Sequence, residues 1–275
     1  FTSVRMICYP NAKINIGLEV VRKRDDGFHD IETVFYPLSL SDILEMNVSA
    51  TPCLTLSGID IVDDPNNNLV LKAYRLLKND FPLPPVSFHL HKQIPTGAGL
   101  GGGSADGAYT LKGLNALFNL NIDTEKLENY ASQLGSDCAF FIQNKPVFAE
   151  GRGNIFTTID LSLKGNWLVL VKPACAVSTA QAYGGVKPEV PGSKLTELVK
   201  MPVSEWGGKV VNRFEESVFS IFPEIGKIKQ TLLDNGAVYA AMSGSGSTVY
   251  GIFEQIPNEL KTQFQNYFYH QECFR

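Results

Sequence analysis

The chain has 275 residues, 44% of them hydrophobic and 19% charged, so it can bury a core in one large domain or two modest ones. Its formal net charge of -4, without any basic block, argues against a nucleic-acid partner. We see neither a membrane-spanning apolar run nor a signal-like N-terminus, so no membrane association is expected. The five cysteines are scattered and never form a Cys-x-x-Cys pair, which favours a reducing, cytoplasmic location and disfavours a zinc site.

The first half of the chain shows strand and helix patterns in turn. In the first strand Ile14, Ile16, Leu18 and Val20 alternate with polar or small residues, which predicts one apolar and one polar face. The elements expected next are a strand at 34–40, a helix with apolar positions 69, 73, 76 and 77, a strand at 86–90, a helix over 105–114 and a helix over 123–134 that Gly135 ends.

The second half has a different texture, in which loops separate shorter elements. The elements expected there are a buried strand at 167–171, a loop-rich segment at 188–202, helices at 211–221 and 224–233, and strands at 237–242 and 248–253. Because strands and helices do not alternate regularly, this order predicts an α+β fold in two domains, residues 1–155 and 156–275.

A glycine-rich stretch at 95–106 lies between the strand at 86–90 and the helix that follows. Five of the seven residues from Gly97 to Gly103 are glycine. Ordering such a run is entropically costly, and a physical reason to accept the cost is close approach of backbone N–H groups to an anion. The N-terminus of the following helix adds partial positive charge, so the stretch predicts a phosphate-binding loop. A flexible linker is the alternative, but linkers rarely join a clean strand to a clean helix.

Other nucleotide-binding signatures fit this stretch less well. Gly97, Gly99 and Gly102 satisfy the dinucleotide-binding pattern G-x-G-x-x-G, which would indicate a nicotinamide-dependent oxidoreductase. That fold needs an acidic strand end about 20 residues later, whereas Asp123 and Glu125 open a helix. No Lys-Ser or Lys-Thr follows the glycines, and the protein-kinase motifs are absent.

Two charged residues are candidates for chemistry. Lys13 lies on the face of the first strand opposite Ile14 and Ile16, and periodicity alone favours a solvent-facing lysine over a phosphate-stabilising cation. Asp137 follows a helix stop and precedes an apolar run. It suits the N-cap of a helical turn and a general base equally well.

Two further motifs carry open alternatives. His29 follows a turn and could present its ring nitrogens to a base edge, although a lone histidine is more often an ordinary residue. The segment Ser243-Gly244-Ser245-Gly246-Ser247 lies between two predicted strands, where an anion nest and a tight hairpin loop are equally plausible.

Three motifs together resemble the superfamily named for galactokinase, homoserine kinase, mevalonate kinase and phosphomevalonate kinase (GHMP kinases). They are Pro10-Asn11-Ala12-Lys13-Ile14-Asn15, the stretch at 95–106, and Met242-Ser243-Gly244-Ser245-Gly246-Ser247. The resemblance implies a two-domain fold with the active site in the cleft between the domains, and an ATP-dependent phosphotransferase with an alcohol as acceptor.

Within this superfamily, further segments resemble the family of 4-diphosphocytidyl-2-C-methyl-D-erythritol kinases. They are Ala12-Lys13-Ile14-Asn15, Arg24-Asp25-Asp26-Gly27-Phe28-His29, Asn68-Leu69-Val70, Leu134-Gly135-Ser136-Asp137 and Phe148-Ala149-Glu150-Gly151. The resemblance implies ATP and this cytidine diphosphate compound as substrates, with Mg²⁺ bridging phosphates, in non-mevalonate isoprenoid biosynthesis. It assigns neither the metal ligands nor the oligomeric state.

The resemblance also implies roles for individual residues. Asp137 would accept the proton of the attacking hydroxyl, and Lys13 would stabilise the charged groups. The residues that would wrap the ATP phosphates are Pro95, Thr96, Gly97, Ala98, Gly99, Leu100, Gly101, Gly102, Gly103, Ser104 and Ala105. The substrate-binding positions would be Asn15, Phe28, His29, Asn68, Lys92, Thr179 and Tyr183, with Phe28 and Tyr183 stacking on cytosine and His29 hydrogen-bonding it.

Two positions depart from the pattern of the family. Phe28 stands where tyrosine is common, which keeps the aromatic face and loses a hydroxyl. Cys138-Ala139 replaces a frequent Val-Pro beside Asp137. Neither change removes a catalytic group.

Overall fold

The computed structural model describes residues 5–61 and 64–275, and residues 1–4 of the N-terminal segment lie outside the described residues. No helix in the described part of the chain has the length and apolar character needed to cross a bilayer. The residues group into two compact units. The first comprises Phe1–Lys13, Pro37–Thr96 and Gly101–Lys145, and the second comprises Ile14–Tyr36, Gly97–Leu100 and Pro146–Arg275.

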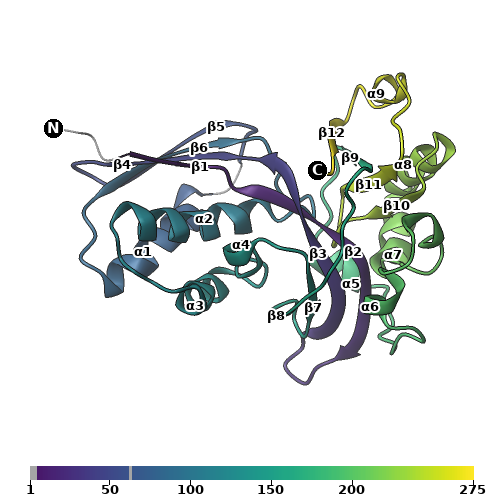
Figure 1. Ribbon diagram of the computed structural model, residues 1–275, viewed down its shortest axis with the longest axis horizontal. Helices are drawn as coiled ribbons and strands as arrows, with labels where there is room; N and C mark the ends of the chain where they lie inside the picture. The colour runs from purple at the N-terminus through teal and green to yellow at the C-terminus, as the bar shows by residue number, and fades with distance from the viewer. Residues whose placement is uncertain (1–4, 62–63) are drawn as a thin grey trace. The chain divides into compact units, whose positions relative to one another are not determined.

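The first unit is a four-stranded sheet with helices on one face (Figure 1). Its strand order is β1-β4-β6-β5, in which β5 and β6 run parallel and the other pairs are antiparallel. The elements are β1 (Arg5–Cys8), β4 (Ile43–Val48), β5 (Cys53–Gly58), a 3₁₀ turn (Pro65–Asn67), α1 (Leu69–Asp80), β6 (Val86–Lys92), α2 (Gly102–Leu117), α3 (Thr124–Leu134) and α4 (Phe140–Gln143).

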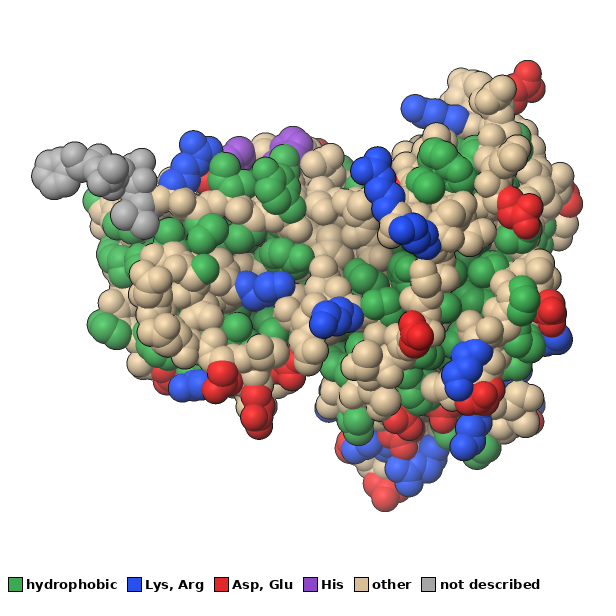
Figure 2. All heavy atoms as spheres, in the orientation of Figure 1, with side chains coloured by type: hydrophobic (Ala, Val, Ile, Leu, Met, Phe, Trp, Pro, Cys, Tyr) green, Lys and Arg blue, Asp and Glu red, His purple; other side chains and the backbone are tan. Residues whose placement is uncertain are grey.

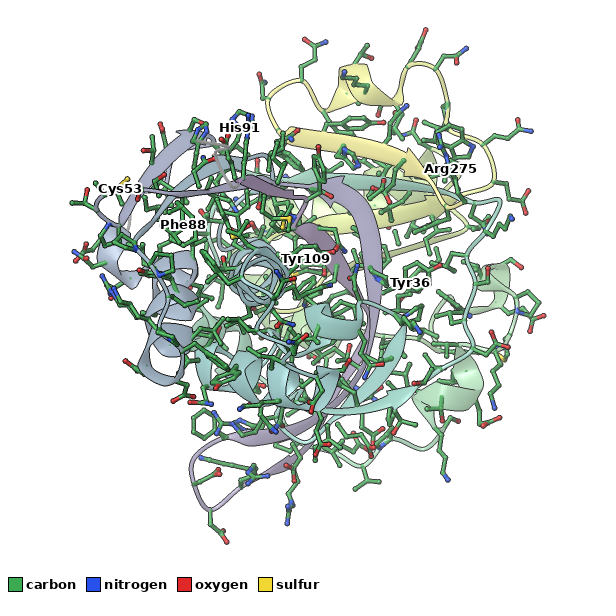
Figure 3. All side chains as sticks on the ribbon, turned by 60° about the vertical axis from the view of Figure 1, so that its left-hand side comes forward. Tyr36, Cys53, Phe88, His91, Tyr109 and Arg275 are labelled. Atoms are coloured by element: carbon green, nitrogen blue, oxygen red, sulfur yellow. The ribbon has the colours of Figure 1, made fainter. Side chains whose placement is uncertain are left out.

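Local signals explain where these helices begin and how closely they pack. Asn68 caps α1 by accepting the N–H of Val70, and Asp123 caps α3 in the same way. Gly113 lets α2 approach the sheet, since a Cβ there would lie 2.2 Å from Cε of Met46. Figure 3 labels Phe88 on the sheet and Tyr109 on α2. The core of this unit therefore lies between the sheet and α2.

The second unit contains two four-stranded sheets, with orders β2-β3-β7-β8 and β10-β11-β9-β12. The strands are β2 (Asn11–Lys23), β3 (His29–Ser41), β7 (Val147–Glu150), β8 (Ile155–Thr158), β9 (Trp167–Lys172), β10 (Tyr239–Met242), β11 (Val249–Phe253) and β12 (Phe268–Cys273). The helices are α5 (Thr179–Tyr183), α6 (Leu195–Leu198), a 3₁₀ turn (Val203–Glu205), α7 (Phe214–Ile221), α8 (Pro223–Asp234) and α9 (Leu260–Gln263). One apolar cluster joins Leu18 of β2 to Val169 of β9 and Phe214 of α7.

The predicted α+β class and most predicted elements are confirmed. The expected polar face of the first strand is wrong, because β2 is buried on both faces from Asn11 to Val20. The loop-rich segment at 188–202 contains the short helix α6. The ranges 1–155 and 156–275 stay a prediction, and β2 and β3 each contribute residues to both packing units.

Candidate active site

The first unit holds a lysine–aspartate pair in which the lysine is buried and the aspartate is partly exposed. Nζ of Lys13 lies 3.3 Å from Oδ2 of Asp137, and the two side chains are 4% and 31% exposed. The solvent-facing interpretation of Lys13 is therefore wrong. Asp137 is not a helix cap either, because α4 begins after Ala139 without any side-chain capping bond. Burial raises the pKa of the neighbouring Cys138 thiol to about 12, so this thiol stays neutral beside the pair.

The N-terminus of α2 lies against the same lysine. Gly101 is the residue that caps α2, with φ of 72°, and a Cβ there would come within 3.1 Å of the Lys13 side chain. Gly101 has no side chain with which to cap this helix, so the N–H groups of the first turn lack the usual capping acceptor from that residue. An anion at this end of α2 would meet both the helix dipole and the ammonium group.

The glycine loop leaves space where phosphates could lie. Gly97 and Gly99 also have positive φ, which side-chain-bearing residues rarely adopt. A Cβ on Gly97 or Gly103 would meet nothing within 4 Å, whereas one on Gly99 would lie 2.0 Å from the carbonyl oxygen of Ser243. The loop is thus open at two glycines and tightly packed at a third.

In the second unit, the loop between β10 and β11 fixes the glycine loop to β2. The hydroxyl of Ser243 accepts the N–H of Asn15 at 3.1 Å and donates to the carbonyl of Gly99 at 2.8 Å. The side chain of Asn15 donates to Thr33. The hairpin interpretation of residues 243–247 is confirmed, since β10 and β11 pair antiparallel around them. The anion-nest interpretation stays a prediction.

The predicted base-binding residues also belong to the second unit. The rings of His29 and Tyr183 stack with centroids 4.5 Å apart, and Phe214 contacts Tyr183 edge-on at 4.7 Å. Phe28 is 49% exposed, and the guanidinium of Arg152 lies 3.6 Å from its ring centre. No local pattern in the sequence pointed to Arg152. Figure 2 shows the charged side chains gathered at the tip of the β2–β3 hairpin that carries Phe28.

Three predicted substrate contacts have distinct local settings. Thr179 is exposed at the start of α5, after the capping residue Ser178. Asn68 is the N-cap of α1. The Lys92 side chain is only 1% exposed and pairs with Asp42 and Asp106, two residues that sequence analysis did not select. A role of Lys92 in substrate contact stays a prediction. The two ion pairs of Lys92 indicate that it holds neighbouring segments in place.

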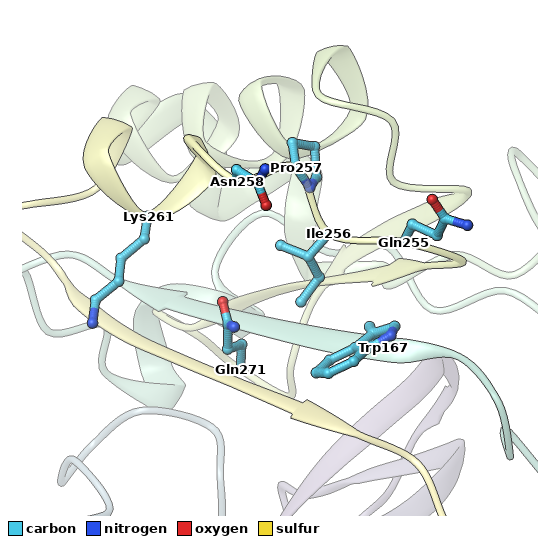
Figure 4. A pocket seen from close by; sticks show the side chains of 7 residues that line it. All are labelled: Trp167, Gln255, Ile256, Pro257, Asn258, Lys261 and Gln271. Atoms are coloured by element: carbon cyan, nitrogen blue, oxygen red, sulfur yellow. The ribbon is translucent and has the colours of Figure 1, made fainter.

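A surface pocket of about 360 Å³ in the second unit contains none of these residues (Figure 4). Its lining is Trp167, Gln255, Ile256, Pro257, Asn258, Lys261 and Gln271. Neither an acidic residue nor a histidine is among them, so the pocket lacks an obvious general base. Within 5–61 and 64–275, no three His, Cys, Asp or Glu side chains are grouped to hold a metal ion.

Comparison with known proteins gives the class of the chain. The family model described as "GHMP kinases N terminal domain" matches residues 68–145, and "GHMP kinases C terminal" matches residues 199–270. A mevalonate kinase structure from Methanococcus jannaschii shares the fold, with a TM-score of 0.72 over 98% of both chains at 14% identity. The fold is that of a GHMP kinase.

More similar proteins define the family within this class. A 4-diphosphocytidyl-2-C-methyl-D-erythritol kinase from Bacteroides fragilis is 54% identical over 274 residues and 98% of each chain. A crystal structure of 4-(cytidine 5'-diphospho)-2C-methyl-D-erythritol kinase matches with a TM-score of 0.80 and 28% identity, over 97% of this chain and 98% of that one. The chain belongs to the 4-diphosphocytidyl-2-C-methyl-D-erythritol kinase family.

Proposed function

We propose that this chain transfers the γ-phosphoryl group of ATP to the 2-hydroxyl group of 4-diphosphocytidyl-2-C-methyl-D-erythritol, releasing ADP and the 2-phosphate product. The observation that carries the proposal is the contact of 3.3 Å between Lys13 and Asp137 beside Gly101 at the start of α2. The names of the relatives support this acceptor over another alcohol.

The Lys13–Asp137 pair would supply the acid–base and charge chemistry. The Asp137 carboxylate accepts the proton of the attacking hydroxyl, which makes that oxygen a better nucleophile. The Lys13 ammonium holds the carboxylate in place and offsets negative charge on the transferring group. Because the protein does little covalent chemistry in phosphoryl transfer, positioning and charge stabilisation supply most of the rate.

The glycine loop would bind the phosphates of ATP. Its backbone N–H groups and the N-terminus of α2 attract the anion, and the open space at Gly103 admits it. Mg²⁺ usually keeps several waters and binds nucleotide phosphates with few protein ligands. An ion held mainly by the phosphates would shield their charge during transfer.

The cytosine ring would bind among the aromatic residues of the second unit. Phe28 and Tyr183 offer flat faces for stacking, and His29 offers ring nitrogens to the base edge. The His29 ring now covers one face of Tyr183. His29 must therefore turn away if the base stacks on that face.

We also propose the setting of the reaction. Cys8, Cys53, Cys138, Cys175 and Cys273 are all free thiols, which supports a reducing cytoplasm. The product would enter non-mevalonate isoprenoid biosynthesis. The two family matches lie on either side of residue 155, which supports the division of the sequence into these two ranges, although the packing units interleave along the chain.

The test is ADP release with this acceptor, comparing the wild type with Asp137→Asn and Lys13→Met. Each variant should fold and lose 10²-fold or more of its turnover, roughly the contribution of one general base or charge stabiliser. The exposed residues Asp160 and Lys164 provide matched controls, Asp160→Asn and Lys164→Met, which should keep wild-type rates.

Each alternative gives a distinct result, the first two in the same assay and the third in a thermal-stability measurement. Full activity of Asp137→Asn would refute the mechanism. Turnover of mevalonate or homoserine instead would leave the kinase class and refute the acceptor. Thermal stabilisation by NADH but not by ATP would indicate an oxidoreductase, since ligands stabilise the states that they bind.

A further inference from the structure

Three ionisable side chains are buried together in the first unit, outside the Lys13–Asp137 pair. The Lys92 ammonium forms ion pairs with Asp42 and, at 2.8 Å, with Asp106. The side chains of Lys92, Asp42 and Asp106 are 1%, 0% and 3% exposed. With both acids ionised, the group holds one more negative than positive charge out of water.

One member of this triad holds the start of the glycine loop. Asp42, which separates β3 from β4, accepts the N–H groups of Gln93 at 2.6 Å and Ile94 at 2.8 Å. Gln93 and Ile94 immediately precede the loop that begins at Pro95. The Asp42 backbone N–H in turn donates to the carbonyl of Pro10 at 2.8 Å. The carboxylate therefore ties the start of the loop to the frame of the first unit.

The other members hold the end of the loop. Asp106 lies in α2, just after the last loop residues, and its carboxylate accepts a hydrogen bond from the Lys92 ammonium. That ammonium also lies 3.4 Å from the place that a Cβ on Gly102 would occupy. Through Lys92, the end of the loop is joined to the same Asp42 that holds its start.

We propose that Asp42, Lys92 and Asp106 are positioning residues, which fix both ends of the phosphate-binding loop and thereby set the affinity for ATP. A run with five glycines has high chain entropy, and fixing its ends lowers the cost of ordering it around phosphates. Small displacements of such a loop would weaken binding, because its N–H groups act only at short range.

The energetics favour positioning over stability as the task of the triad. Buried ion pairs are often no more stable than apolar side chains of similar volume. Oδ1 of Asp106 is buried and has no hydrogen-bond partner among the described residues, which is unfavourable for folding. Burial, opposed by Lys92, raises the pKa of Asp106 to about 8, which marks the cost of an ionised acid there.

The test uses the full chain and a non-hydrolysable ATP analogue. Asp106→Leu removes the link to α2 and leaves Lys92 paired with Asp42. We expect the melting temperature of this variant to be unchanged or raised. We expect its dissociation constant for the analogue and its KM for ATP each to rise about tenfold or more. The KM for the acceptor should stay within about twofold. Asp106→Asn keeps an oxygen for the Lys92 ammonium and should restore analogue affinity to within about threefold.

A matched control separates positioning from stability. Leu77→Ala creates a cavity in the core of the same unit, so it should lower the melting temperature and leave analogue affinity unchanged. Wild-type affinity in folded Asp106→Leu would overturn the proposal. If that variant does not fold, Asp106→Ala is measured against the same two outcomes.

The inference rests on the proposed function only in that ATP is the phosphoryl donor. Because the readout is analogue binding, a different acceptor alcohol would refute the proposed substrate and leave this test valid.

Discussion

Ser243 and Gly99, 144 positions apart in the chain, are joined by a hydrogen bond of 2.8 Å from the Ser243 hydroxyl to the Gly99 carbonyl. The same hydroxyl accepts the N–H of Asn15, two residues after Lys13. Three segments resemble kinase motifs, and the fully buried Ser243 belongs to one of them. Its hydroxyl connects that segment to the other two.

Ser243→Ala should lower both stability and ATP affinity. It leaves the buried N–H of Asn15 and carbonyl of Gly99 without this partner, which costs about 1–3 kcal/mol of the free energy of unfolding. We expect the KM for ATP to rise severalfold, as measured by initial rates alongside urea unfolding. Ser220→Ala is the control, since that hydroxyl donates to the carbonyl of Ser217 within α7. An unchanged KM for ATP would show that the bond does not order the loop.

Gly103→Ala should separate ATP binding from folding. A Cβ at Gly103 meets nothing within 4 Å and the residue lies in the first turn of α2, so alanine should stabilise the chain by up to about 1 kcal/mol. If the phosphates occupy that space, the methyl group should weaken binding of the ATP analogue about tenfold or more. Gly207→Ala, at another open position outside the loop, should leave binding unchanged. Wild-type affinity of Gly103→Ala would place the phosphates elsewhere.

Tyr183→Leu should affect the acceptor and spare the nucleotide. Stacking of a base on an aromatic ring contributes about 1–3 kcal/mol, so the KM for the acceptor should rise about tenfold or more. The KM for ATP should stay within about twofold. Tyr9→Leu, at a 60% exposed tyrosine, is the control.

Titration with cytidine diphosphate should also shift the NMR signals of the His29 ring, because that ring now stacks on Tyr183. Unshifted His29 signals at saturation would contradict the proposed base site.

The raised pKa of Asp106 predicts how the stability of the chain depends on pH. Its pKa is raised from 3.8 to about 8 by burial, which outweighs the attraction of Lys92, while Asp42 raises it further. The folded chain therefore binds this proton more tightly than the unfolded chain. Its contribution to stability is complete below pH 4 and is lost as pH rises towards 8. Asp106→Asn removes the titration, so its stability relative to the wild type should rise from pH 5 to about 8 and then level off. Urea unfolding across this range measures the difference, and a constant difference would mean that Asp106 stays ionised.

Local signals in the sequence predicted much of the frame around the glycine loop. The alternation at Val86, Phe88 and Leu90 predicted β6, and the helical spacing after Gly103 predicted α2. In the structure Asn68 and Asp123 cap α1 and α3, so the starts of these helices are also fixed by local chemistry. These features depend on neighbours in sequence, which a single chain reveals.

Long-range features were not predictable in the same way. The polar residues of β2 look solvent-facing by alternation, but other segments cover both of its faces. The partners of Lys92 lie 50 and 14 positions away, and nothing in their local sequence marks Asp42 as an anchor. The same holds for Arg152, whose contact with Phe28 depends on how β3 and β7 pair. Such pairings depend on the folded topology and leave no periodic signal.

The chain passes between its two packing units at Lys13, Tyr36, Thr96, Leu100 and Lys145. The units are therefore not modular, and no single cut separates them. A fragment that ends at residue 155 would keep Leu18 and Val20 but lack Val169 and Val171, which belong to the same apolar cluster. Such a fragment would expose that surface and tend to aggregate. Split reporters should therefore not divide the chain near residue 155.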